Sequence, residues 1–259
     1  MNGYGLDIAP NANDLSFSYG PGVIGPASEI RRLDDIRASL PNPKAAGPEN
    51  LYGIVMDVHR AQDKDALLAR NLLFGAVVYT GGKIGDGPVR SQGHKHAVSP
   101  SCGRSTPEVY EIWEGEAIVY MQHFAGCDAG KCMAVHAKAG DVVVVPPEWV
   151  HQAINASADK PMSFGAWCVR DYGFDYEKVR AMGGMAFYPK FSDDGIKWFF
   201  NDKYSSGDIS EVSAVSYPEL GIKTGIPVYR QFVDNSDAFL FVSNPLLADD
   251  VWKVMNAKA

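Results

Sequence analysis

The chain has 259 residues, of which 46 % are hydrophobic, so it can build a core and is not expected to be largely disordered. It has 24 Lys and Arg residues and 31 Asp and Glu residues, which gives a formal net charge of −7. This charge argues against a nucleic-acid partner, because proteins that bind nucleic acids usually carry a basic stripe on their surface. The densest apolar run, Val142 to Val145, is far too short to cross a bilayer, and the N-terminus has no signal-peptide pattern, so no membrane partner is expected.

Residues 1–50 are expected to form an N-terminal arm, because they are rich in Gly, Pro, Asn and Ser. One helical pattern runs through this arm from Ala27 to Leu40, and Pro41 and Pro43 would end it. We expect the arm to pair with a partner chain.

Residues 51–200 contain many short strand patterns separated by turn signals. The expected strands are Leu51–Val58, Asn71–Tyr79, Gln92–Ala97, Val109–Trp113, Ala117–His123, Lys131–His136, Asp141–Val145, Ser163–Val169, Phe187–Phe191 and Ile196–Phe200. A short helix is expected at Asp175–Ala181. Many short strands at regular spacing in one domain are typical of an all-β sandwich or barrel.

Residues 201–259 have loop character at first, followed by a strand candidate at Ala238–Val242 and a helix candidate at Ala248–Met255. We expect this C-terminal extension to pack against the barrel and not to form a separate domain.

Four scattered cysteines do not make a disulfide framework: Cys102, Cys127, Cys132 and Cys168. Cys127 and Cys132 could approach each other across a hairpin loop, but reduced thiols are the simpler interpretation. We therefore expect a cytoplasmic protein.

Three histidines and one glutamate follow a pattern that suits a metal ion. His94 and His96 are separated by one residue, and side chains two apart on a strand point to the same face. Glu108 stands at the head of the next strand, and His151 follows the turn after Val145. Three nitrogens and one oxygen suit a divalent Fe, Mn, Ni or Zn ion and leave coordination positions open.

Other polar groups lie near this set in the sequence. Tyr110, two residues after Glu108, points inward with it and is either a barrel aromatic or a donor to a substrate. A phosphate site at the barrel mouth could be lined by Thr80, Lys83, Arg90, Ser91 and the N–H of Gly93. Lys83 and Arg90 could equally be exposed loop charges. Lys95, between the two histidines, should point away from the metal.

Two motifs resemble those of the cupin superfamily. The first consists of Gly93-His94-Lys95-His96, Glu108 and Gly115. The second consists of Gly140, Pro146, His151 and Asn155. Glu148 stands two residues after the motif proline, where a glycine is common, and this implies a slightly different turn.

Within that superfamily, the stretches around Pro107–Tyr110, Glu114–Ala117 and Val145–His151 resemble the cupin-type phosphoglucose isomerases of archaea and bacteria. These metal-dependent enzymes interconvert glucose 6-phosphate and fructose 6-phosphate. The resemblance covers about residues 15–200. It implies a cupin barrel with an arm and an extension, a sugar-phosphate substrate, one divalent metal per chain with Fe(II) foremost, and a homodimer.

The chain also departs from that family. Phe174 stands near a position where a histidine is expected, the strand at Gly75–Val78 lacks an expected hydroxyl residue, and Ser91 replaces a threonine. Three alternatives therefore stay open: a metal-dependent dioxygenase or decarboxylase of a small organic acid, a free-sugar isomerase, and a sugar-binding module without catalysis.

For an isomerase, the expected ligands are His94, His96, Glu108 and His151, around a metal that polarises the substrate oxygens. Glu108 is the best candidate for the base that moves a proton between C1 and C2, if it leaves or loosens its bond to the metal. Tyr110 could donate to a sugar oxygen. A hydride shift would need the metal but no base, and the sequence does not separate the two mechanisms.

Overall fold

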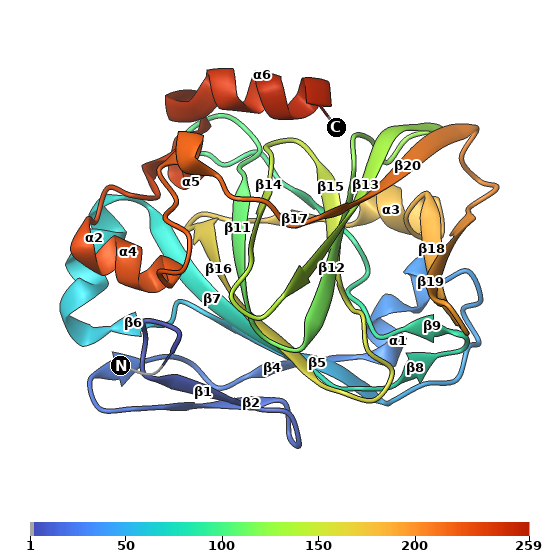
Figure 1. The fold of residues 1–259 in the computed structure, drawn as a ribbon, viewed down its shortest axis with the longest axis horizontal. Coiled ribbons are helices and arrows are strands. Elements are labelled where there is room, and N and C mark those ends of the chain that lie inside the picture. The colour runs from blue at the N-terminus through green and yellow to red at the C-terminus, as the bar shows by residue number, and fades with distance from the viewer. Residues whose placement is uncertain (1–2, 259) are drawn as a thin grey trace.

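A six-stranded sheet and a four-stranded sheet form the wall of a barrel in the computed structural model, which describes residues 3–258 (Figure 1). The six-stranded sheet runs in the order β14 (Val142–Val145), β11 (Glu108–Glu114), β16 (Met162–Val169), β7 (Leu72–Tyr79), β5 (Asn50–Met56) and β4 (Glu29–Arg32). The four-stranded sheet runs in the order β15 (Val150–Asn155), β12 (Glu116–Gln122), β13 (Asp128–Lys138) and β20 (Ser206–Ser213). The all-β prediction of a cupin barrel is confirmed.

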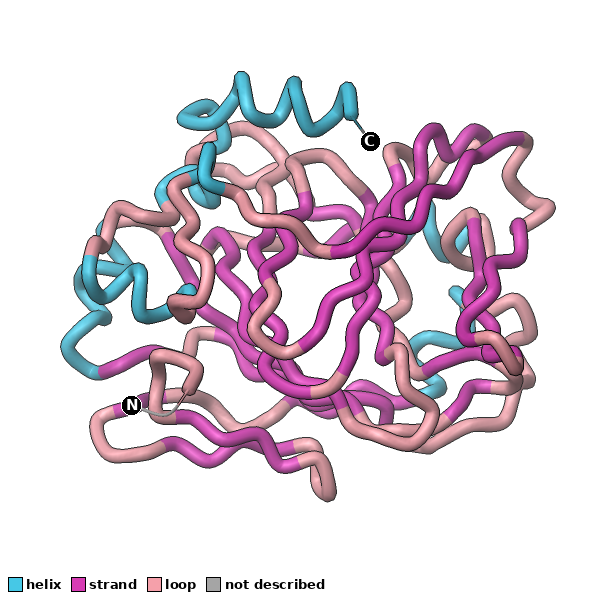
Figure 2. The backbone as a smooth tube through the Cα atoms, in the orientation of Figure 1, coloured by secondary structure: helices cyan, strands magenta, loops and turns pink. Residues whose placement is uncertain are grey.

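Five two-stranded pairs surround the barrel. They are β1 (Ile8–Asn11) with β2 (Ser16–Tyr19), β3 (Val23–Ile24) with β6 (His59–Arg60), β8 (Lys83–Ile84) with β9 (Gly87–Pro88), β10 (Lys95–His96) with β17 (Phe174–Asp175), and β18 (Phe187–Ser192) with β19 (Gly195–Phe200). The helices lie at the periphery, as Figure 2 shows. They are α1 (Leu33–Ile36), α2 (Lys64–Ala69), α3 (Glu177–Ala181), α4 (Val228–Asp234), α5 (Leu240–Ser243) and α6 (Asp249–Lys258). None of these described helices is long and apolar enough to cross a membrane.

Alternation along the strands of the six-stranded sheet separates two cores, one on each face of the sheet. On β11, Tyr110 and Ile112 enter the barrel interior, while Val109 and Trp113 belong to a second core on the outer face of the sheet. This is the two-residue period of a strand. All eight residues of β7 are buried, because both of its faces are covered. The barrel wall next to the candidate ligands is therefore held from both sides.

The C-terminal extension covers the outer face of the six-stranded sheet. Trp167 of β16 stacks on Tyr229 and on Phe239, with ring centroids 5.6 Å and 5.3 Å apart. Figure 1 shows α4 and α5 against this side of the barrel and α6 lying across one end. The extension also supplies β20, which pairs in parallel with β13 at the edge of the four-stranded sheet.

Several expected elements are wrong in detail. Four residues of the helix expected at Ala27–Leu40 form strand β4, because they pair with the edge of β5 and this pairing overrides local helix preference. The strand expected at Ala238–Val242 is largely helix α5, since a short apolar run does not distinguish a strand from a buried helix. Of the strand expected at Gln92–Ala97, only β10 is regular. The parallel strand β20 lies in a segment expected to be loop.

One buried carboxylate ties the extension to the barrel. Glu111 of β11 accepts hydrogen bonds from the Trp113 indole nitrogen at 3.1 Å and from the backbone nitrogen of Val228, at the start of α4, at 3.2 Å. Burial raises the pKa of Glu111 to about 7, although both hydrogen bonds favour the ionised form. The folded protein therefore holds this proton to a higher pH than the unfolded chain does.

This linkage predicts a pH-dependent stability. A carboxyl whose pKa is raised by folding stabilises the fold below its unfolded pKa, and that contribution is lost as the pH rises through about 7. Between pH 5 and pH 8.5, the free energy of unfolding of the wild type should fall by on the order of 2 kcal/mol relative to Glu111→Gln. Urea unfolding at several pH values measures this, and parallel pH profiles for the two proteins would contradict it.

Candidate functional site

Four segments of the chain bring the predicted ligand atoms to one point inside the barrel. His94 precedes β10, His96 lies in β10, Glu108 begins β11 and His151 lies in β15. Their ligand atoms all lie within 4.8 Å of one another. His94 and His151 also exchange two backbone hydrogen bonds, of 2.9 Å and 2.8 Å, which fix one imidazole beside the other. The predicted quartet is therefore assembled by backbone pairing.

Backbone carbonyls set the tautomers of two of these histidines. The Nδ1 of His96 lies 2.9 Å from the carbonyl oxygen of Thr106, and the Nδ1 of His151 lies 3.2 Å from that of Trp149. A carbonyl oxygen only accepts hydrogen bonds, so each Nδ1 carries the proton and each Nε2 of a neutral ring carries a lone pair. Both Nε2 atoms face Oε2 of Glu108, at 3.2 Å and 3.1 Å.

The close approach of these nitrogen and oxygen atoms is stable only if a cation binds among them or the rings are protonated. Lone pairs that face a carboxylate oxygen repel it unless a positive charge lies between them or the rings become protonated. The Nε2 atoms of His94 and His96 are also buried without a hydrogen-bond partner in the described part of the chain. Unpaired buried polar atoms are costly, and a divalent metal would satisfy them all at once. The three nitrogens and one oxygen fit a first-row divalent ion.

The electrostatics of the site favour the protonation states that bind metal. Burial alone would raise the pKa of Glu108, but the two imidazoles beside it, of His151 and His96, outweigh burial and hold the pKa well below the usual range. Burial, together with His151 and His96, holds the pKa of His94 well below its usual value. At neutral pH Glu108 is an anion and His94 is a neutral ligand, as metal binding requires.

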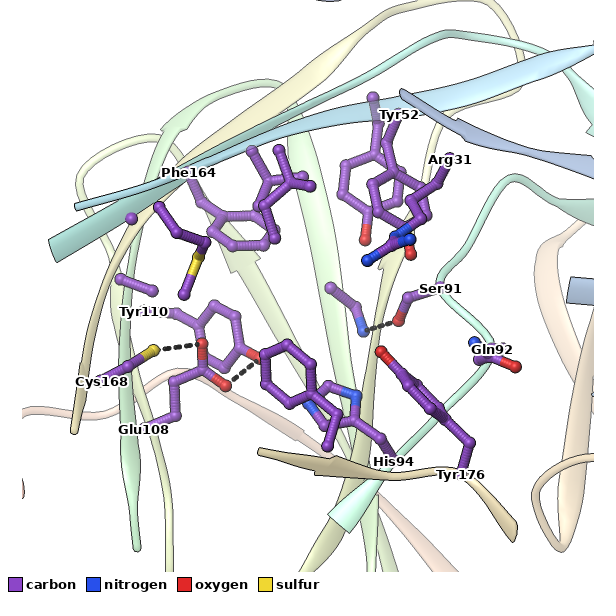
Figure 3. Close-up of a pocket in the computed structure, with 18 residues that line it drawn as sticks. Arg31, Tyr52, Ser91, Gln92, His94, Glu108, Tyr110, Phe164, Cys168 and Tyr176 are labelled. Carbon is purple, nitrogen blue, oxygen red and sulfur yellow. Dashed lines mark hydrogen bonds between the residues drawn. The ribbon is translucent and has the colours of Figure 1, made fainter. Parts of the chain in front are cut away.

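Two further groups orient the Glu108 carboxylate. The Tyr110 hydroxyl donates to Oε2 at 2.8 Å, and the Cys168 thiol donates to Oε1 at 3.2 Å (Figure 3). Burial raises the pKa of both groups well above their ordinary values, so both keep their protons. Such outer partners hold a ligand in place and tune its basicity. The structure thus brings Tyr110 to the ligand set, and it adds Cys168, which the sequence analysis left among the free thiols.

The turn that precedes His151 keeps the backbone form that a glycine would give it. Glu148 has φ +73°, in the left-handed region that favours glycine. Its side chain pairs with Lys95, accepts from the backbone nitrogen of Ser105 at 3.2 Å, and its own N–H donates to the Ser105 hydroxyl at 3.3 Å. The expected change of turn is therefore wrong, because these contacts hold a glutamate in that conformation. Lys95 points away from the metal set, as expected.

A cavity opens beside the four ligands (Figure 3). One part of its wall is apolar and includes Val77, Phe164, Ala166 and Phe174. Another part of the wall is polar and includes Arg31, Tyr52, Ser91, Gln92 and Tyr176. Phe174 packs edge-on against His94, with ring centroids 4.6 Å apart, so a ring without a polar atom covers the ligand where a histidine was expected.

Five protein groups were predicted to bind phosphate, and of these only Ser91 lines this cavity. Thr80 uses its carbonyl to accept from Asn155 at 3.1 Å, and Lys83 is exposed over the ring of Phe191. The others face elsewhere: Gly93 lies against Met185, and Arg90 is buried in a cleft that Ser91 does not line.

Arg31 is a charged cavity residue that the sequence did not predict. It lies on β4 opposite Tyr52 of β5, and both side chains line the cavity. Figure 3 shows its guanidinium pointing inward beside Tyr52, across the cavity from Glu108. Arg31 also pairs with Glu29 at 2.7 Å, and its side chain is 31 % exposed. Arg31 was missed because its segment, Ala27–Leu40, was expected to be a helix. Had Glu29–Arg32 been predicted as a strand, its pairing with β5 would have brought Arg31 next to Tyr52.

A family model and several sequence relatives point to the same family. The family model described as glucose-6-phosphate isomerase matches residues 38–205. The glucose-6-phosphate isomerase of Thermococcus litoralis is 26 % identical over 172 residues, covering 65 % of this chain and 84 % of that protein. The isomerase of Thermococcus onnurineus is 29 % identical, covering 62 % and 80 %, and that of Sinorhizobium medicae is 26 % identical, covering 56 % and 64 %.

The site predicts a specific loss of metal. His94→Ala, His96→Ala and His151→Ala should each lower bound metal to well under one ion per chain, because each removes one of four ligands. The exposed His136 gives a matched control, since its ring pairs with Glu211 at the surface. Elemental analysis of the purified proteins measures this. Full metal content in any of the three variants would remove that residue from the site.

Proposed function

Because the chain belongs to the glucose-6-phosphate isomerase family, we propose that it interconverts glucose 6-phosphate and fructose 6-phosphate at a divalent metal ion held by His94, His96, Glu108 and His151. The observation that carries this proposal is the meeting of two lone-pair-bearing Nε2 atoms and an ionised carboxylate beside a cavity. The cavity has an apolar wall for the sugar carbons and a cationic group at its far side.

The reaction moves hydrogen between C1 and C2 and protons between their oxygens. A bound divalent ion supplies Lewis-acid stabilisation to the negative charge that develops on those oxygens. Glu108 is ionised, and once it loosens its bond to the metal it can take a proton from one carbon and return it to the other. Tyr110 keeps its proton and can donate to a substrate oxygen or to Glu108. The apolar wall limits the exchange of that proton with water.

Arg31 and Ser91 support recognition of the phosphate. The Ser91 oxygen accepts from the backbone nitrogen of Ala153 at 3.1 Å, and its hydroxyl is a hydrogen-bond partner of Tyr79, which also lines the cavity, so a phosphate would have to replace Tyr79 as the acceptor of the Ser91 proton. A guanidinium stays charged at all relevant pH values and can hold two phosphate oxygens at once. This pair offsets the hydroxyl residue that the stretch Gly75–Val78 of β7 lacks, where the cavity residues are Gly75 and Val77.

We further propose Fe(II) as the resident metal, with Mn, Ni and Zn as the other candidates that the donor set accepts. A cytoplasmic location is supported by the four free thiols, which suit a reducing compartment. The homodimer, in which the N-terminal arm pairs with a partner chain, stays a prediction.

The test of this function is a substrate comparison. Metal-loaded protein should convert glucose 6-phosphate to fructose 6-phosphate, and should act far more slowly on free glucose. Arg31→Gln should raise KM for the phosphorylated sugar roughly tenfold or more, because one charge-assisted contact is lost, and should leave metal content unchanged. A coupled assay for fructose 6-phosphate measures both.

Two outcomes would contradict the proposal. Equal rates with free and phosphorylated sugars would indicate a free-sugar isomerase. Oxygen uptake with small organic acids, in the absence of sugar isomerisation, would indicate a dioxygenase on the same barrel. Lys83→Ala is a matched control for Arg31→Gln, because it removes one nearby positive charge that does not line the cavity.

A separate prediction concerns Glu108. Glu108→Gln keeps the shape of the side chain and one acceptor oxygen but loses the charge and most of the basicity. We expect kcat to fall by on the order of a hundredfold or more in fully metal-loaded protein. Steady-state kinetics with parallel metal analysis measures this. A wild-type rate at full metal content would place the base elsewhere or favour a hydride shift.

A further inference from the structure

Arg90 and Ser91 belong to the same extended segment but face opposite ways. The backbone of this segment pairs with β15: Arg90 forms a bridge with Ile154, and the Ser91 nitrogen donates to the Ala153 carbonyl at 3.0 Å. Ser91 lines the cavity of the metal site. Arg90 lines a different cleft, between the segment 40–46, the β8–β9 hairpin and β18. Figure 1 shows β8, β9 and β18 together at one side of the molecule, beside α1.

Arg90 is a buried cation with few partners. Its exposed fraction is 3 %, and the hydrogen bond found for its side chain runs from Nη1 to the carbonyl oxygen of Pro88 at 3.1 Å. In the described part of the chain it makes no ion pair at 4.0 Å or less. Burial lowers the pKa of Arg90 to about 10, so the guanidinium is still charged at neutral pH. Among residues 3–258, four of its five N–H groups have no acceptor that would offset the burial.

The cleft around Arg90 is positive, although the whole chain is acidic. Lys44 and Lys190 line it with Arg90, and Asp86 is the one carboxylate among the lining residues. Asp86 is already engaged by Lys190, at 2.9 Å. Three cations thus stand against one carboxylate, in a protein of formal net charge −7.

Gly87 keeps room in front of the guanidinium. A Cβ at this position would lie 2.7 Å from the carbonyl oxygen of Pro189 and 3.2 Å from Nη1 of Arg90. Any side chain here would press against β18 and against the arginine. The absence of a side chain leaves the N–H groups of Arg90 facing the cleft.

We propose that this cleft binds a small phosphate-bearing anion at a second site, separate from the cavity of the metal centre. A phosphate group has about two negative charges at neutral pH, which matches the surplus of positive charge, and its several oxygens can accept from a planar guanidinium and two ammonium groups together. Binding removes the penalty of a buried, unpaired cation.

Calorimetric titration with inorganic phosphate at constant ionic strength tests the proposal. The titration is made on metal-loaded Arg31→Gln protein, so that the cavity has lost its own cation. We expect one phosphate per chain. Adding Lys44→Ala and Lys190→Ala should weaken binding at least tenfold, because two charge-assisted contacts are lost. Adding Lys83→Ala instead should leave it unchanged, since Lys83 does not line the cleft.

Arg90→Gln should abolish the binding, and if this variant fails to fold, the double lysine variant decides. Absence of phosphate binding in Arg31→Gln protein would overturn the proposal. So would binding that the two lysine substitutions leave unchanged. The readout does not depend on catalysis, so a failure of the isomerase assay would leave this result standing.

Discussion

Mutual repulsion among four buried ligand atoms is the constraint on which the site depends. Three imidazole nitrogens and a carboxylate oxygen lie within 4.8 Å of one another, and carbonyl partners direct two of the nitrogen lone pairs at the carboxylate. Such an arrangement persists only where the surrounding structure fixes every member and a cation neutralises the set. The backbone bridge between His94 and His151 and the donors on both oxygens of Glu108 provide that fixation.

The rest of the fold makes the strands around this point rigid. Two cores, one inside the barrel and one under the C-terminal extension, hold β7, β11 and β16 from both faces. Glu111 couples the extension to β11, the strand that begins with Glu108. Glu148 holds the turn before His151 through Lys95 and Ser105. Elements far from the metal ligands thereby determine how closely those ligands can approach one another.

The metal ligands could be predicted from sequence because they depend on spacing along strands and turns, which two-residue alternation largely fixes. The anion-binding groups could not, because they depend on which strand pairs with which. Arg31 reaches the cavity only through the pairing of β4 with β5, and a helical pattern concealed this strand. Arg90 was expected beside Ser91, but adjacent residues of an extended segment face opposite sides, so it lines another cleft. Cys168 was missed because only the pairing of β16 with β11 brings it to Glu108.

The most direct test of the account is a metal titration of metal-depleted protein, with bound metal and formation of fructose 6-phosphate from glucose 6-phosphate measured in the same samples. The account predicts that the rate rises in proportion to bound metal and reaches its plateau at one ion per chain. Isomerisation at full rate without metal would contradict it, as would the absence of isomerisation at one metal ion per chain.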